Sequence, residues 1–262
     1  MPLIRQTRRD NIVELQLARP EKHNALSFAL IRELLAVGKR LVSDRQLRAV
    51  ILCGAGESFC SGIDLADLRN PANRWHAAWQ LIKPGQSDYQ RVCLIWRRLP
   101  VPVIASLHGH CFGAGMQLAL GADIRIAHPA TQLSIMEGRW GLVPDMGLSE
   151  SLRGVVATDV AKDLCFSARV LNGEQALAKG LVSRVDGNPL AAAHRLAAEY
   201  AERSPDALMA AKQVVQSMND RRPARSLALE KRWQLKLMLG RNLAIAQRRA
   251  KQPDLPFGPR QY

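Results

Sequence analysis

A glycine-rich turn over residues 109–115 has the residue types best suited to chemistry. It follows an apolar segment and precedes a helical one, with small residues at Gly113, Ala114 and Gly115. The first amides of a helix lack intrahelical partners and lie at the positive end of the helix dipole. Small residues let a ligand oxygen come close to the backbone. The turn therefore predicts a site for negative charge developing on oxygen, although glycines at a strand–helix junction also serve tight packing.

A second turn, residues 54–65, follows the continuous apolar run at residues 49–53. Such runs are typical of strands buried on both faces. Loops that leave the carboxyl ends of parallel strands share one crevice, where α/β proteins bind ligands. The two turns together could give two backbone N–H donors to one carbonyl oxygen.

Several familiar catalytic motifs are missing. The sequence has no GxSxG, no HExxH and no GxxxxGK[ST], and the glycines of the 109–115 turn do not follow GxGxxG. A plain dinucleotide-binding oxidoreductase is therefore disfavoured. The five cysteines form no CxxC pair and have no metal-ligand spacing to histidine, so we expect no metal site and thiols kept in a reducing compartment.

Strands alternating with helices must position the two turns. We expect strands over 12–17, 49–53, 101–107 and 123–127, and helices over 26–42, 89–98 and 115–120. Ser27 is placed as the N-cap of the first of these helices. This order predicts parallel βαβ units in an α/β domain.

Helical periodicity dominates after about residue 158, where only 181–185 is expected as a strand. A length of 262 residues allows one large domain with a smaller appendage. We therefore divide the chain into an α/β core, 1–200, and a C-terminal helical region, 201–262. Residues 66–88 have no clear period and predict a loop, in which Trp75 and Trp79 either wall an apolar pocket or pack in the core.

Composition places the chain among globular proteins, with 47% hydrophobic and 23% charged residues. No apolar stretch approaches the ~18–20 residues of a membrane helix, and the first residues lack the apolar region of a secretory signal. We expect a soluble, cytoplasmic protein.

The net charge is +14, and residues 221–262 hold eleven Lys and Arg against two Asp and Glu. A basic tail of this kind indicates either a polyanionic partner or a solvated helical face.

The whole chain resembles the crotonase superfamily, which contains the enoyl-CoA hydratases and isomerases. Residues 102–127 are similar to the signature of that family, 19–26 and 59–65 to its two CoA-contacting loops, and 178–185 to a late strand. Residues 204–213 match as well. The resemblance implies a spiral of ββα units with a helical C-terminal oligomerisation region, assembled as a homotrimer or a dimer of trimers.

The resemblance also implies a binding site. It places the oxyanion hole at the backbone amides of Ile63 and Ala114, and it makes CoA a part of the substrate, with no permanently bound cofactor. The implied CoA-binding residues are Arg19, Lys22, Ser61, Asp64 and Leu65, and the basic C-terminal helix is a further candidate for the CoA phosphates. We expect no nucleic-acid partner, because no nucleic-acid-binding fold signature is present.

The reaction depends on three positions of the family pattern. Family hydratases use two glutamates, which correspond here to Gln117 and Glu137. A neutral amide at the first position disfavours two-glutamate hydration, whereas one base suffices to move a double bond. Glu137 alone resembles the Δ3,Δ2-enoyl-CoA isomerases.

Asp145 follows Glu137 by eight residues, the spacing of a Glu–Asp pair in the Δ3,5,Δ2,4-dienoyl-CoA isomerases. Those enzymes have a further aspartate where this chain has Gln117, so the match is incomplete. Asp145 is therefore either catalytic or an acid at the start of a helix. The alternatives to an isomerase are a hydratase in which Glu137 and Asp145 share the acid and base roles, and an acyl-CoA-binding protein without catalysis.

Overall fold

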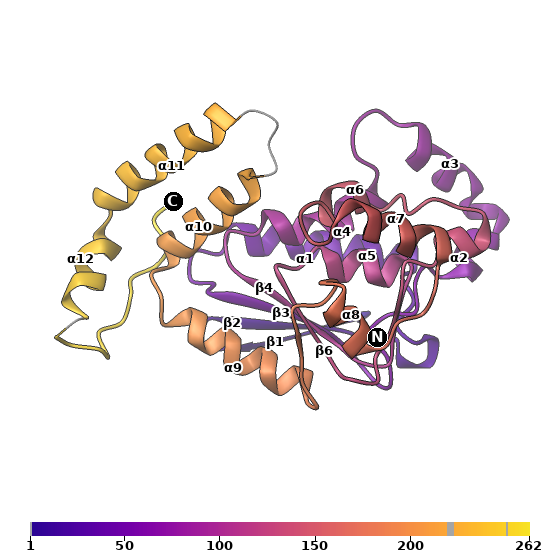
Figure 1. Cartoon of the computed structure of the whole chain (residues 1–262), viewed down its shortest axis with the longest axis horizontal. Helices are drawn as coiled ribbons and strands as arrows, with labels where there is room; N and C mark the ends of the chain where they lie inside the picture. The colour runs from indigo at the N-terminus through magenta and orange to yellow at the C-terminus, as the bar shows by residue number, and fades with distance from the viewer. Residues whose placement is uncertain (1, 219–222, 250) are drawn as a thin grey trace.

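A six-stranded sheet forms the centre of the protein, whose computed structural model describes residues 2–218, 223–249 and 251–262 (Figure 1). The strand order is β1-β2-β3-β4-β6-β8, with β1 antiparallel to β2 and every other pair parallel. The strands are β1 (Ile4–Arg9), β2 (Ile12–Leu17), β3 (Ala49–Gly54), β4 (Val103–Leu107), β6 (Ile124–Ala127) and β8 (Arg184–Val185). The predicted α/β class is confirmed.

A small second sheet pairs β5 (His110–Phe112) with β7 (Gln132–Ser134). Along the chain, β4 of the large sheet leads to β5 and then to helix α5, and β6 leads to β7 and then to η3 (Glu137–Trp140) and helix α6. Cys60, after β3, extends the small sheet through a parallel bridge to Cys111. Each unit thus places one strand in each sheet before its helix, which is the expected spiral of ββα units.

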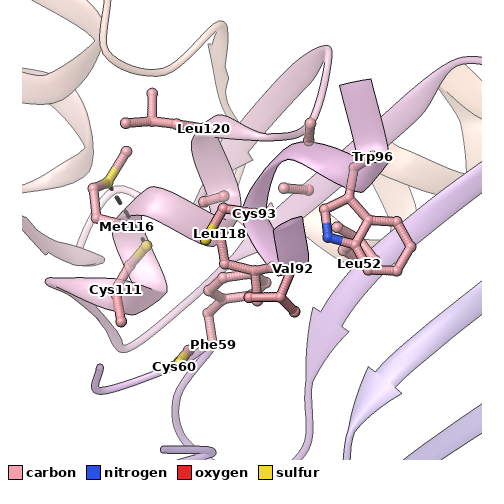
Figure 2. Packing of buried hydrophobic residues seen from close by; sticks show 14 of the residues in the cluster. Leu52, Phe59, Cys60, Val92, Cys93, Trp96, Cys111, Met116, Leu118 and Leu120 are labelled. Atoms are coloured by element: carbon pink, nitrogen blue, oxygen red, sulfur yellow. Dashed lines mark hydrogen bonds between the residues drawn. The ribbon is translucent and has the colours of Figure 1, made fainter. Parts of the chain in front are cut away.

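Helices cover both faces of the large sheet. The main core lies between the sheet and α1 (Phe28–Val42), α4 (Asp88–Arg98) and α5 (Ala114–Leu120). Figure 2 shows part of it, with Trp96 of α4 beside Leu52 of β3 and with Leu118 of α5 near Val92 and Cys93 of α4. On the other face, α9 (Pro189–Ala201) packs against β3, β4 and β6. It buries the strand side chains that alternate with those facing the main core. Burial on both faces explains the continuous apolar run in β3.

Short helices connect these layers. They are α2 (Leu65–Arg69), η2 (Pro71–Asn73), α3 (Arg74–Ile82), α6 (Leu148–Ser151), α7 (Thr158–Ser167) and α8 (Gly173–Ala178), besides η1 (Pro20–Lys22). The expectation of a loop over 66–88 is wrong, because α2, η2 and α3 occupy much of it. The two tryptophans of α3 are 87% and 56% exposed, so they do not pack in the core as one alternative had it.

The C-terminal helices α10 (Pro205–Ser217), α11 (Pro223–Met238) and α12 (Arg241–Arg248) extend to one side of the core (Figure 1). Met209, Ala210 and Trp233 form a small apolar cluster of their own between α10 and α11. Residues 219–222 of the predicted helical region lie outside the described residues. Within the part of the chain that the structure describes, no helix has the length and apolar character needed to cross a bilayer.

Candidate active site

The two loops that were expected to contact CoA lie side by side. The Leu26 amide donates to Gly62 O at 2.8 Å, and the Asp64 amide donates to Leu26 O at 3.0 Å. Arg19 adds a side-chain link, since its guanidinium donates to Asp64 Oδ2 at 2.8 Å and to the Ala25 carbonyl. Backbone pairing and one partly buried ion pair therefore fix the position of the 59–65 loop.

The same loop is joined to the glycine-rich turn. The Phe112 amide donates to Cys60 O at 3.1 Å, and the Cys60 amide donates to His110 O at 2.9 Å. At Gly62, φ is +115°, and a Cβ there would lie 3.2 Å from Phe112 O and 3.9 Å from Ala114 N. Glycine is needed at this position by both backbone conformation and space.

This arrangement leaves two amides free. Ile63 N follows Gly62, and Ala114 N begins α5, and neither donates a hydrogen bond to any residue that the structure describes. The neighbouring amides of Cys60, Asp64 and Gly113 all have acceptors. Unpaired amides on loops this firmly held are suited to stabilise an oxyanion. The structure thus brings the two predicted donors onto adjoining loops.

Glu137 lies beside the turn that leads to Ala114. It begins η3, and its Oε1 would be 3.4 Å from a Cβ added at Gly113, the residue before Ala114. Oε1 accepts a hydrogen bond of 2.6 Å from Gln117 Nε2. Oε2 is buried and has no hydrogen-bond partner among the described residues. One oxygen of the carboxylate is therefore held, and the other is available as a base.

Gln117 is fully buried on α5, and both ends of its amide have protein partners. Its Oε1 accepts from the Met146 amide at 2.9 Å. Because an N–H can only donate, this bond fixes the orientation of the side-chain amide, and Nε2 must then face Glu137. Gln117 is thus a donor to the carboxylate, and it links Glu137 to the segment that contains Asp145.

Opposing influences set the protonation of Glu137. Burial raises the pKa of its carboxyl, and the charge of Asp145 acts in the same direction. The hydrogen bond from Gln117 and local backbone amides lower the pKa and partly offset these effects. The net shift is upward, toward the range in which a carboxylate is a better proton acceptor.

Asp145 does not cap a helix. Helix α6 begins at Leu148 with Gly147 as N-cap, and no side chain donates or accepts at that cap. The carboxyl of Asp145 keeps much of its surface exposed, yet the surrounding protein desolvates it enough to raise its pKa. The alternative that this acid only starts a helix is not supported, and a catalytic role stays a prediction.

The expected CoA-binding residues have different surroundings. Lys22 is exposed, Leu65 is half exposed, and Ser61 Oγ donates to the Lys22 carbonyl at 3.4 Å. Arg19 and Asp64 face each other in the ion pair described above. Their paired side chains hold the loops together, so any contact with CoA from these two stays a prediction.

Sequence reasoning missed Tyr89, in the first turn of α4. Its hydroxyl is buried without a hydrogen-bond partner among the described residues. Burial raises its pKa to about 12, and Asp145 contributes to the shift. A buried hydroxyl within the electrostatic reach of Asp145 is a candidate contact for substrate. Only its position in an amphipathic helix was visible in the sequence, and that indicates core packing.

Comparisons with known proteins agree with this geometry. A model of the enoyl-CoA hydratase/isomerase family matches residues 7–242. The mitochondrial Δ(3,5)-Δ(2,4)-dienoyl-CoA isomerase of Mus musculus is 38% identical over 212 residues, which are 77% of this chain and 64% of that protein. The chain thus matches slightly less than two thirds of the length of that relative.

Solved structures show the same fold. An enoyl-CoA hydratase from Bacillus anthracis superposes with a TM-score of 0.89 at 26% identity, covering 99% of this chain and 100% of that one. A protein from Thermobifida fusca YX in complex with CoA gives a TM-score of 0.80 at 29% identity, covering 90% and 93%. The extent of the family match and of these similarities shows that the chain belongs to the enoyl-CoA hydratase/isomerase family, within the crotonase superfamily.

Proposed function

We propose that the chain is an enzyme that shifts a double bond in an enoyl-CoA or dienoyl-CoA thioester, with Glu137 as the base. The observation that carries this proposal is that Glu137, which has one unpartnered carboxylate oxygen, lies beside the turn before Ala114, whose amide and that of Ile63 on the adjoining loop are unpaired. The name of the mouse relative, a dienoyl-CoA isomerase, and the CoA complex of the Thermobifida protein support it.

The reaction begins when the thioester carbonyl oxygen accepts hydrogen bonds from Ile63 N and Ala114 N. Glu137 Oε2 then takes a proton from the carbon next to the carbonyl, and the electron pair moves to the oxygen, giving a dienolate. Each amide stabilises the developing charge by about 3–4 kcal/mol. The protonated Glu137 returns the proton to a carbon farther along the chain, the double bond moves into conjugation, and the carboxylate is restored.

Hydration requires more of the site. A second group would have to handle the other proton of the added water, and Gln117 is a neutral amide whose two ends are already engaged. The alternative enzyme is therefore a hydratase that pairs Glu137 with Asp145. The Bacillus anthracis neighbour, named an enoyl-CoA hydratase, favours keeping this alternative. A third possibility is an acyl-CoA-binding protein without catalysis.

Absorbance of the conjugated thioester separates the three functions. Purified protein is given a 3-enoyl-CoA and, separately, a 2-enoyl-CoA. Gain of conjugation with the first substrate supports isomerisation, and loss with the second supports hydration. No change with either substrate, together with retained CoA affinity, contradicts both enzymatic proposals and supports binding alone.

Assembly into a homotrimer or dimer of trimers belongs to the same proposal. The end of α11 and the residue after it expose three large apolar side chains, Leu235, Met238 and Leu239, which are 59% exposed or more. A row of exposed apolar residues on a terminal helix is typical of a surface that another chain covers. Light scattering of the purified protein measures the assembly directly.

Phosphates of the CoA are the proposed partners of Lys22 and of the basic C-terminal region. If these cations bind CoA phosphates, added salt should weaken the binding of an acyl-CoA but change the binding of an acyl-pantetheine little. Titration of both ligands at several salt concentrations provides the test. Equal salt dependence would instead assign these charges to a solvated surface.

A further inference from the structure

A cavity of about 460 Å³ lies at the far end of the molecule from the candidate active site. It is lined by the N-terminal end of α12, by the chain from Gly258 to Gln261, and by Arg45 in the connection between α1 and β3. Its size is within the ~300–1,000 Å³ typical of small-molecule sites.

Strand direction separates this cavity from the site of Glu137. Arg48 immediately precedes β3, whereas the loop that contains Ile63 follows the carboxyl end of the same strand. Six residues of strand span about 20 Å. The cavity is therefore at the amino ends of the parallel strands, and the site of Glu137 is at their carboxyl ends.

Arginines dominate the lining. Arg45, Arg241 and Arg260 line the cavity, and no acidic residue does. Arg48 lies directly behind it and donates from Nη2 to the carbonyl of Gly258 at 2.8 Å. The nearest carboxylates are Asp206, bound by Asn242 Nδ2 at 2.7 Å, and Asp44, paired with Arg8.

Arg260 is the most buried of the three arginines that line the cavity. It is 4% exposed, and it donates from Nε to the carbonyl of Tyr262 and from Nη2 to the carbonyl of Val42. Its Nη1 is buried without a hydrogen-bond partner among the described residues. An unpaired buried guanidinium nitrogen costs free energy, so the charge of Arg260 is only partly compensated beside the cavity.

Burial and neighbouring charges also shift the pKa of Arg260. Burial lowers the pKa of Arg260, and Arg45 and Arg48 act in the same direction, against Asp206 and Asp44. Three of the residues that line the cavity are arginines and none is acidic, so the charge that faces the cavity is positive. An anion would be attracted to it.

The wall of the cavity is built by specific contacts. The Arg260 amide donates to Arg45 O at 3.0 Å, and the Gln261 amide donates to Asp206 Oδ1 at 2.8 Å. Asn242 Oδ1 accepts from the Gly258 amide at 3.0 Å. These bonds hold the cationic side chains around one space.

We infer that this arginine-lined cavity is a second binding site, which takes the phosphate group of a phosphorylated small molecule. Arginine is suited to this group because its planar fork matches the geometry of phosphate oxygens. A bound phosphate would join α12 and the final residues to the α/β core. The phosphate can come from a free metabolite or from the nucleotide end of a CoA bound to a neighbouring chain.

Calorimetric titration with inorganic phosphate and pyrophosphate tests the inference at constant ionic strength. The variants are Arg241→Met and Arg45→Met, whose side chains line the cavity and are exposed. Arg248→Met is the matched control, because Arg248 is an exposed arginine on the same helix and does not line the cavity.

We expect saturable binding of one anion per chain, at least tenfold weaker in Arg241→Met and Arg45→Met and unchanged in Arg248→Met. No saturable heat up to about 10 mM anion would overturn the inference. Equal weakening in all three variants would also overturn it, because that result indicates general charge attraction.

The source of the phosphate is tested by the KM for acyl-CoA. A KM raised in both Arg241→Met and Arg45→Met assigns the site to CoA of a neighbouring chain. An unchanged KM, with anion binding lost, assigns it to a free phosphorylated metabolite. Because the anion titration needs no turnover, it stands or fails separately from the proposed isomerase activity.

Discussion

The two glycine-rich loops and the segment from Glu137 to Gly147 contribute to the same site but are held in different ways. The loops are joined by successive backbone hydrogen bonds, with Gly62 and Gly113 at positive φ. The segment contains one 3₁₀ turn and an irregular stretch with exposed apolar side chains at Leu142 and Val143.

This difference follows the chemistry that each region supports. Amides that stabilise charge work best when they need not reorganise, so a rigid backbone favours them. A carboxylate that receives and returns a proton needs one oxygen fixed by a hydrogen bond and the other available. Gln117, on α5, donates the hydrogen bond that fixes Glu137 Oε1. Substitutions that alter backbone conformation should therefore lower activity when they are made in the glycine-rich loops. Substitutions of single side chains should lower activity when they are made in the segment from Glu137 to Gly147.

The largest effect is expected from Glu137→Gln. Loss of a general base typically costs 10²–10⁴-fold in rate, so we expect about a thousandfold lower kcat. Binding of the CoA thioester should survive, because both amides remain. Steady-state kinetics and ligand titration measure the two quantities. If the variant keeps more than a tenth of the activity, a loss below ~1.4 kcal/mol, the base lies elsewhere, with Asp145 the next candidate.

Stability provides the control for this variant. Because burial raises the pKa of Glu137, ionisation favours the unfolded chain, and stability falls as pH rises from the unfolded pKa through the raised folded pKa. Glutamine removes this loss. Thermal unfolding near neutral pH should therefore show a variant at least as stable as the wild type.

Gly62→Ala tests the loops. Alanine at φ +115° is strained by about 1–3 kcal/mol, and its Cβ would press on Phe112 O at 3.2 Å. Moving the Ile63 amide should cost ~10²-fold in kcat, the value of one oxyanion donor. Gly85→Ala is the matched control, since Gly85 has φ +78° and open space around it. Similar kinetics for the two alanine variants would show that the loop position does not matter.

The contrast between the regions also explains what the sequence could predict. Glycines at strand ends are local signals, so the positions of Ile63 and Ala114 followed from the two turns and the family pattern. The bond between Gln117 and Glu137 joins residues twenty positions apart, and no local pattern indicates it. The family pattern placed Gln117 at the position of a hydratase glutamate, and the structure shows that it donates to Glu137.

The secondary structure shows the same limit of prediction from local sequence patterns. The central strands were predicted because both of their faces are buried. In β1 only the first residue, Ile4, is buried, so no alternation marks the strand. Helix α3 has no apolar period because its buried residue is polar: Gln80 bonds Asp88 through both ends of its amide. Tertiary pairing, which a single sequence does not display, produces these elements.

Gln117→Leu tests the hydrogen bond between helix α5 and Glu137. Leucine removes the donor that lowers the pKa of Glu137, so the acid limb of the kcat/KM profile should move to higher pH. We expect about a tenfold loss at neutral pH and partial recovery at alkaline pH. A uniform loss at every pH would indicate only a packing defect.

Gln117→Glu gives the contrasting profile. A carboxylate at this position would face Glu137, so the two groups should titrate as a pair with two apparent pKa values and a bell-shaped profile. Hydration of a 2-enoyl-CoA should rise, because the second acid-base group of a hydratase is then present. A variant with wild-type pH dependence would contradict contact between these two side chains in solution.

The smallest and most selective effect is expected from Asp145→Asn. In a 3,5-dienoyl thioester the proton must reach a carbon farther from Glu137 than in a 3-enoyl one, and a second proton carrier helps only there. We expect about tenfold slower isomerisation of the dienoyl substrate and less than threefold change with the 3-enoyl substrate. Removing the charge should also shift the acid limb slightly to lower pH, because Asp145 raises the pKa of Glu137. Equal, modest effects on both substrates would contradict the dienoyl assignment, and Glu137 would then be the one acid-base residue of the proposed reaction.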